Sequence, residues 1–232
     1  MKQGTRRAFR IIFTVTVFVM IVVAHHFSAN YLPTVTPSAR AILIDPGHGG
    51  EDGGASSADG TLEKTINLAI ALDLRDVLTL CGLPVEMTRD TDVSIHDAGC
   101  TTTRQMKVSD MNNRLKQYDD AAIAVSIHQN HFSVSKYSGT QVFYSTAHPL
   151  SAQLAASVRE RVITHLQPKN TRELKQATDS IFLLHRTVKP AILVECGFLS
   201  NAQENNKLKQ SDYQKQMALA IAVGLLDVYQ YE

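Results

Sequence analysis

The sequence lacks the features that mark several classes of protein. No run of basic residues follows Arg10, and 23 Lys and Arg nearly balance 22 Asp and Glu, which argues against nucleic acid as a partner. There is no internal repeat and no low-complexity tract. Because 44% of the residues are hydrophobic and only 19% are charged, we expect a packed globule instead of a disordered chain.

Cysteine is scarce as well. Cys81, Cys100 and Cys196 are odd in number and form no CxxC pair, so they do not indicate a disulfide framework. Cys81 closes a helical stretch and Cys196 lies in a strand-like run, and we expect both to be small buried residues. A nucleophilic thiolate at Cys196 is the alternative, although the neighbouring Glu195 has the better case for a role in chemistry.

Long apolar runs are absent except at the N-terminus. A basic segment over residues 2–10 precedes an apolar run over residues 11–24, a pattern typical of secretory signals. The run is short for a full membrane span, which needs about 20 residues. We expect residues 1–29 to be a signal peptide or an N-terminal membrane anchor. Either outcome places the rest of the chain outside the cytoplasmic membrane.

The remaining chain divides into a linker and one domain. Residues 30–40 carry two prolines, two threonines and little periodicity, which indicates a linker. From residue 41 onward, strand and helix patterns alternate, as expected of a three-layer α/β domain. Strands are expected at residues 41–44, 84–89, 121–127, 141–145 and 191–194, and helices at residues 66–80, 104–118, 151–166 and 211–229. The strand at 141–145 alternates more than the others and is expected to be an edge or antiparallel strand. Ser151 is the expected N-cap of the third helix.

Three polar residues stand where buried strands end. His48 follows the first strand, His128 the third, and Glu195 interrupts an apolar run. In open α/β sheets, ligands bind beyond the carboxyl ends of the strands, so these residues are expected at one edge. Glu63 would join them from the start of the first helix. Two imidazoles and one carboxylate make a typical protein set for catalytic zinc, and a further glutamate can act as the base.

Each of these residues also has an ordinary structural interpretation. The glycines around His48 could form a plain turn, while a phosphate loop would need the Lys-Ser/Thr ending that is missing here. The helix dipole alone favours Glu63 in a first turn. His131, close to His128, is a surface histidine, a substrate contact or a spare ligand. Glu195 could be a carboxylate bonded to backbone amides, but in an apolar run it must be paired, protonated or functional.

Taken together and in this order, six motifs resemble the zinc-dependent N-acetylmuramoyl-L-alanine amidases of the bacterial cell wall. The motifs are IDPGHGGEDGGA with the following LEKTINL, VEMTRDTD, VSIHQN, SGTQVFYS and PAILVECGFLSN, and the resemblance runs from about residue 42 to residue 229. The segments SGTQVFY and SIFLLHRTVKPAILVECGFLSN are most similar to the germination-specific members found in spore-forming bacteria.

The resemblance implies a zinc amidase catalytic domain over residues 41–232, built on a mixed, mostly parallel sheet with helices on both faces. The family's metal ligands fall on His48, Glu63 and His128, with one Zn²⁺ per chain, and its catalytic glutamate falls on Glu195. The substrate would be peptidoglycan, cut between N-acetylmuramic acid and L-alanine. The narrower resemblance adds muramic-lactam formation in the spore cortex and a location at the forespore. The segment from Asn130 to Gln141 is too short for the inhibitory helix of the cell-division members.

The sequence is compatible with several alternatives. The rival functions are a zinc peptidase that cuts the stem peptide and a wall-binding protein without turnover. An activating protein partner and an association of the N-terminus with the membrane are both compatible with the sequence. Asp45 and Asp52 either orient a histidine or belong to turns. Arg89 and Arg114 either face a carboxylate of the peptide stem or lie on a solvated surface.

Overall fold

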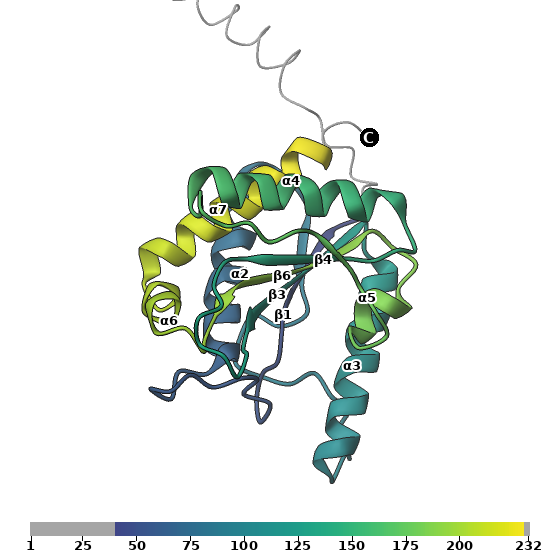
Figure 1. The fold of residues 1–232 in the computed structure, drawn as a ribbon. Coiled ribbons are helices and arrows are strands. Elements are labelled where there is room, and N and C mark those ends of the chain that lie inside the picture. The colour runs from purple at the N-terminus through teal and green to yellow at the C-terminus, as the bar shows by residue number, and fades with distance from the viewer. Residues whose placement is uncertain (1–39, 230–232) are drawn as a thin grey trace, which may run out of the picture. The chain divides into compact units, whose positions relative to one another are not determined.

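The computed structural model describes residues 40–229, whose strands form a six-stranded sheet (Figure 1). The strand order is β2-β1-β3-β6-β4-β5. The strands are β1 (Ile42–Pro46), β2 (Val85–Met87), β3 (Ile123–Asn130), β4 (Gln141–Tyr144), β5 (Lys175–Gln176) and β6 (Ala191–Phe198). Strands β2, β1, β3 and β6 are parallel, and β4 runs antiparallel to β6. The predicted mixed, mostly parallel sheet is therefore confirmed.

Helices cover both faces of this sheet, which confirms the three layers. They are α2 (Glu63–Leu80), α3 (Thr103–Asp120), α4 (Pro149–His165), α5 (Phe182–Arg186), α6 (Ala202–Leu208) and α7 (Ser211–Tyr229). Helices α2 and α4 lie on one face of the sheet, and α7 packs against both. Helices α3 and α5 form a smaller layer on the other face (Figure 1).

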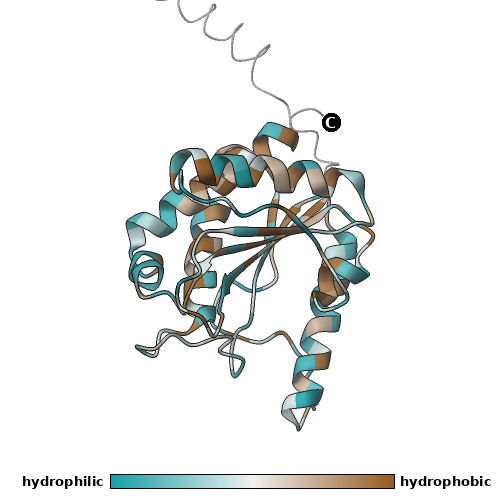
Figure 2. Cartoon of the chain, in the orientation of Figure 1, coloured by the Kyte–Doolittle hydropathy of each residue, from teal (hydrophilic) through white to brown (hydrophobic). Residues whose placement is uncertain are grey.

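The alternation of side chains along the strands explains the two layers. In β1, Ile42 and Ile44 join the core under α2, α4 and α7, while Leu43 joins the smaller cluster under α3 and α5. Successive side chains of a strand point to opposite faces, and a parallel sheet covered on both faces is apolar on both. Figure 2 shows this as hydrophobic colouring along the central strands.

Most predicted elements are confirmed, with shifted ends. Helix α2 begins at Glu63 instead of residue 66, because the loop carbonyls of Ala55 and Gly53 accept hydrogen bonds from the first amides of the helix, those of Glu63 and Lys64. Strands β3 and β6 continue past the predicted ends, so His128 and Glu195 lie inside their strands instead of after them. Strand β4 is antiparallel, as one alternative held, but it is not an edge because β5 pairs with it.

Some local predictions were wrong. The N-cap of α4 is His148, whose Nδ1 accepts from the Leu150 amide, while Ser151 instead accepts a hydrogen bond from the Ala191 amide of β6. Cys81 is exposed, because it lies just beyond the last turn of α2, whereas Cys196 is buried as expected. The short elements β5, α5 and α6 were missed, because two to seven residues carry too little periodicity to detect.

The predictions for residues 1–29 and for nearly all of the 30–40 linker lie outside the described residues. Among residues 40–229, no helix is both long enough and apolar enough to cross a membrane.

Candidate metal centre

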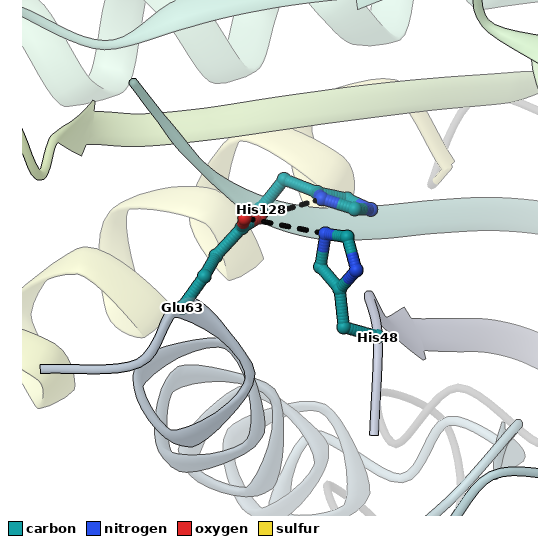
Figure 3. A group of neighbouring side chains, drawn as sticks. All are labelled: His48, Glu63 and His128. Atoms are coloured by element: carbon teal, nitrogen blue, oxygen red, sulfur yellow. Dashed lines mark hydrogen bonds and ion pairs between the residues drawn. The ribbon is translucent and has the colours of Figure 1, made fainter. Parts of the chain in front are cut away.

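His48, Glu63 and His128 converge at the carboxyl edge of the sheet (Figure 3). Each residue offers one ligand atom, and the three atoms lie within 4.8 Å of one another. Glu63 lies between the two imidazoles: its Oε2 is 3.2 Å from His48 Nε2, and its Oε1 is 2.8 Å from His128 Nδ1. Three segments distant in sequence therefore deliver three side chains to one point.

His48 is held in an unusual backbone conformation by the loop after β1. Its φ of 62° makes it the one non-glycine residue with positive φ in the described part of the chain. The Oδ1 atom of Asp52 lies 3.0 Å from His48 Nδ1, which leaves Nε2 directed at Glu63. Burial lowers the pKa of His48, but Asp52 and Glu63 more than offset this and raise it to about 9. Asp52 thus orients a histidine, and it also accepts from the Gly54 amide in the turn.

Glu63 is the first residue of α2, and its carboxylate is buried. The Ala55 amide donates to Oε2 at 2.8 Å, and the Gln129 amide donates to Oε1 at 3.1 Å. Burial raises the pKa of Glu63, but the bonds with His128 and His48 lower it far below its ordinary value. The carboxylate is therefore ionised, which a metal ligand requires.

The glycine before His48 makes room for the second imidazole. A Cβ placed on Gly47 would lie 2.1 Å from Nε2 of His128, so no side chain fits there. The two imidazole rings consequently approach to 5.0 Å between centroids in an edge-to-face arrangement.

Glu195 lies beside His128 in the register of β3 and β6. Its Oε2 atom is buried and has no hydrogen-bond partner among residues 40–229. Burial raises the pKa of Glu195 to about 7, with His128 and His48 lowering it and Glu63 raising it. The alternative of a carboxylate satisfied by backbone amides is therefore not observed for this atom.

A cavity of about 800 Å³ opens beside His48, His128 and Glu195. Its lining also includes residues of α3 and α5, among them the apolar Met111 and Phe182. The connection between β3 and β4 contains no helix, as expected from its length, and His131 is exposed in it.

Two expectations for charged residues were wrong. Arg89 and Arg114 are 3% and 2% exposed, so they lie neither on a solvated surface nor free to meet a substrate carboxylate. Both donate to backbone carbonyls of the His48 loop. Among residues 40–229, Asp45 makes no hydrogen bond to a histidine side chain, and it lies in β1 instead of a turn; it accepts hydrogen bonds from Arg114, Thr88 and Tyr118.

Two buried amides near Glu63 were missed in the sequence. Asn67 lies one turn after Glu63 on α2 and donates to Glu63 Oε1 at 3.3 Å and to the Gly47 carbonyl at 3.2 Å. Gln129 donates to Asn67 in turn. The i, i+4 spacing of Glu63 and Asn67 on one helix face was the available signal.

The donor set fits a zinc ion. Two imidazole nitrogens and one carboxylate oxygen form a common ligand set for catalytic zinc, and the ring of His48 is oriented by a carboxylate, as is usual for ligating histidines. The Glu195 oxygen beside this set is buried without a hydrogen-bond partner in the described residues, and it is suited to accept a proton.

Comparison with known proteins gives one consistent result. The family model described as N-acetylmuramoyl-L-alanine amidase matches residues 42–227. The chain is 33% identical over 215 residues to the germination-specific N-acetylmuramoyl-L-alanine amidase of Bacillus subtilis, and the match covers 90% of each chain.

Solved structures agree with the sequence match. The CwlD amidase of Clostridioides difficile, determined in complex with the GerS lipoprotein, is similar with a TM-score of 0.80 and 38% identity, over 83% of this chain and 100% of that chain. An N-acetylmuramoyl-L-alanine amidase from Clostridium difficile 630 gives a TM-score of 0.72 at 28% identity, over 84% and 98% of the two chains.

Proposed function

The chain belongs to the N-acetylmuramoyl-L-alanine amidase family, and from this premise we propose that it uses one zinc ion held by His48, Glu63 and His128. It is a hydrolase that acts on peptidoglycan. The proposed scissile bond joins the lactyl group of N-acetylmuramic acid to L-alanine. The convergence of two imidazoles and a carboxylate, with Glu195 one strand away, is the observation that carries the proposal.

In the proposed mechanism Glu195 is the proton shuttle. Its buried Oε2 atom accepts a proton from the attacking water and returns it to the nitrogen of L-alanine as the amide bond breaks. Burial raises the pKa of this carboxyl above its ordinary value, in the direction that suits a group which both accepts and releases a proton near neutral pH. A zinc ion, when bound, supplies the Lewis acidity that activates water and polarises the amide carbonyl. Asp52 keeps the His48 ring in place throughout.

Mass analysis of wall fragments tests the activity. Purified muropeptides would be incubated with zinc-loaded protein and with chelated protein. We expect free muramyl lactyl groups and new L-alanine amino termini from the zinc-loaded protein alone. Cleavage within the stem peptide would instead identify a zinc peptidase, and full activity after chelation would contradict the metal assignment.

We further propose that the protein acts in the spore cortex, where it would take part in muramic-lactam formation. The similarity over nearly the whole length to the germination-specific enzyme of Bacillus subtilis supports this role. A deletion strain should make a cortex without muramic-lactam, and the wild-type gene should restore it. A deletion cortex with normal muramic-lactam would contradict the role.

An extracytoplasmic location is also proposed, either secreted or anchored to the outer face of the cytoplasmic membrane. The basic and apolar pattern of residues 2–24 supports it. A lipoprotein is the proposed activating partner, because the similar CwlD amidase was determined in complex with one. Protease accessibility in intact protoplasts tests the location. Turnover measured with and without a candidate lipoprotein from the same host tests the partner.

A further inference from the structure

The segment from Pro46, the last residue of β1, to Gly49 carries His48, and arginine side chains bond three of its carbonyls. His48 has a φ of 62°, a left-handed conformation that is sterically unfavourable for a residue with a Cβ. Such a conformation persists only where the surroundings enforce it. The carbonyls of Pro46, Gly47 and His48 all accept hydrogen bonds from arginine side chains.

Arg89, which follows β2, supplies the first set of donors. Its Nε donates to the Pro46 carbonyl at 3.0 Å, and its Nη2 donates to the Gly47 carbonyl at 2.9 Å. The same guanidinium donates to the Lys64 carbonyl, one residue after Glu63, at 3.1 Å. It therefore connects the loop of one proposed ligand to the helix of another.

Arg114, from α3, supplies the second set. Its Nη1 donates to the Pro46 carbonyl at 3.0 Å, and its Nη2 donates to the His48 carbonyl at 2.8 Å. Asp45 and Asp110 pair with this guanidinium and fix it in turn. The two arginines thus bond the three consecutive carbonyls of residues 46–48.

The shape of the guanidinium group makes this arrangement possible. A guanidinium presents its donors in a rigid planar fork, whereas a lysine has one compact ammonium on a flexible stem. Burial and the nearby Arg114 lower the pKa of Arg89. The two neighbouring guanidinium groups repel each other, and nearby carboxylates such as Asp45 and Asp110 offset this repulsion. A Cβ on Gly49 would lie 2.2 Å from the Val93 carbonyl oxygen and 2.8 Å from Cδ of Arg89, so no side chain fits between the loop and these two groups.

We propose that Arg89 and Arg114 are positioning residues that hold the His48 loop by its carbonyls and thereby direct the His48 ring at the metal. This inference rests on the proposed zinc site. Neither arginine touches the reacting atoms; both act through the backbone of residues 46–48. Residues that hold the ligands of a metal in place without contacting the metal tune its affinity. The main effect of Arg89 and Arg114 should therefore be on zinc binding.

Lysine variants test the inference while they keep the charge. Arg89→Lys and Arg114→Lys would be compared with the wild type and with Arg159→Lys, a matched control whose Nε also donates to a backbone carbonyl, that of Arg172, away from the site. Zinc affinity would be measured by competition with a chromophoric chelator. We expect a 10- to 100-fold loss for the two variants and no change for the control.

Hydrogen exchange on the zinc-free proteins gives a second readout. Peptides that cover residues 45–51 should exchange faster in both variants, while peptides from residues 191–198 should not change. A purely structural role would instead lower the unfolding temperature and leave zinc affinity and local exchange unchanged in the folded variants, which would overturn the inference.

The positioning role can be distinguished from a folding defect and from a failure of the zinc site. If Arg114→Lys does not fold, because it also partners Asp45, then Arg89→Lys decides, since its acceptors are all backbone carbonyls. A wild type that binds no zinc, or a His48→Ala variant that binds it as tightly as the wild type, would refute the proposed zinc site itself. Wild-type zinc binding with unaffected lysine variants would refute the positioning role alone.

Discussion

At position 195 a carboxylate occupies a strand whose other residues are mostly apolar. Within residues 40–229 the Oε2 atom of Glu195 is buried without a partner, which is costly, and such a group persists in a folded protein where it has a function. In the sequence, Glu195 stands out because it interrupts an apolar run. Its neighbour Cys196 is fully buried, which raises the pKa of the thiol well above its ordinary value and makes it unsuited to nucleophilic attack.

Replacement of Glu195 tests its role. We expect Glu195→Gln to lower turnover about 10²- to 10⁴-fold, because the amide cannot accept a proton, while zinc content stays near that of the wild type. Turnover would be measured on muropeptides and zinc by elemental analysis. Glu204→Gln is the control, since among residues 40–229 that carboxylate accepts only from the Gly139 and Phe198 amides. Unchanged turnover of Glu195→Gln would refute the assigned role.

Protonation of Asp45 is expected to lower the free energy of unfolding at acidic pH. Burial raises its pKa, but Arg114 and hydrogen bonds from Thr88 and Tyr118 outweigh this and lower it to about 2, with a smaller contribution from His128. A carboxyl with a depressed folded pKa stabilises the fold above its unfolded pKa of about 4. This stabilisation, about 2 kcal/mol, is lost as the pH falls from about 4 towards 2.

Urea unfolding of the zinc-free protein across this range measures the effect. The wild type should lose about 2 kcal/mol more than Asp45→Asn over the same pH interval, because only the wild type protonates at this position. Parallel curves for the two proteins would show that the Asp45 carboxyl does not carry the difference.

At the scale of elements, two glycines of the loop after β1 differ in whether the metal site requires them. Gly47→Ala would place a Cβ 2.1 Å from Nε2 of His128, so the ring must move. In Gly53→Ala the nearest atom is 3.4 Å away, on Leu62, which is ordinary contact. We expect at least a 10-fold loss of zinc affinity in the first variant and little change in the second, by chelator competition. Equal affinities would show that the ring position does not matter.

The packing of α7 on α4 depends on a different glycine. A Cβ on Gly224 would lie 2.5 Å from Cα of Val158, which is backbone and cannot move aside. Helix propensity alone predicts that Gly224→Ala gains about 1 kcal/mol. We expect the close approach to dominate and the variant to be less stable by about 1–3 kcal/mol.

Thermal unfolding distinguishes the two signs for Gly224→Ala. Leu219→Ala on the same helix is the control, because Leu219 is exposed and its replacement should change stability by about 0.5 kcal/mol or less. A higher unfolding temperature for Gly224→Ala would contradict the close approach of the two helices.

At the scale of the whole molecule, a metal that binds only the folded state should stabilise it. Free zinc at 100 times its dissociation constant adds about 2.7 kcal/mol, which corresponds to roughly 5–10 °C for a domain of this size. His48→Ala should lose this shift, and His131→Ala should keep it, since His131 is exposed and lies outside the ligand group. Differential scanning calorimetry with and without chelator checks both, and a lost shift in His131→Ala would show that the ligand set is wrong.

The sequence by itself determined the fold class, most strands and helices, and the four residues gathered at the sheet edge. These follow from local signals: apolar period, loop glycines and polar residues where buried strands end. Helices α5 and α6 and the N-cap of α4 could not be predicted, because each depends on a few residues whose partners lie elsewhere in the chain.

Only the tertiary structure decided what surrounds those four residues. Arg89 and Arg114 lie more than 40 residues from the carbonyls they bond in the His48 loop, and Asp45 meets Tyr118 across 73 residues. No local pattern encodes such contacts, because a guanidinium has the same sequence signature on a solvated surface as in a buried network. The local sequence determines which side chains lie at the edge of the sheet, and the packing of β1, β2 and α3 determines how these side chains are oriented.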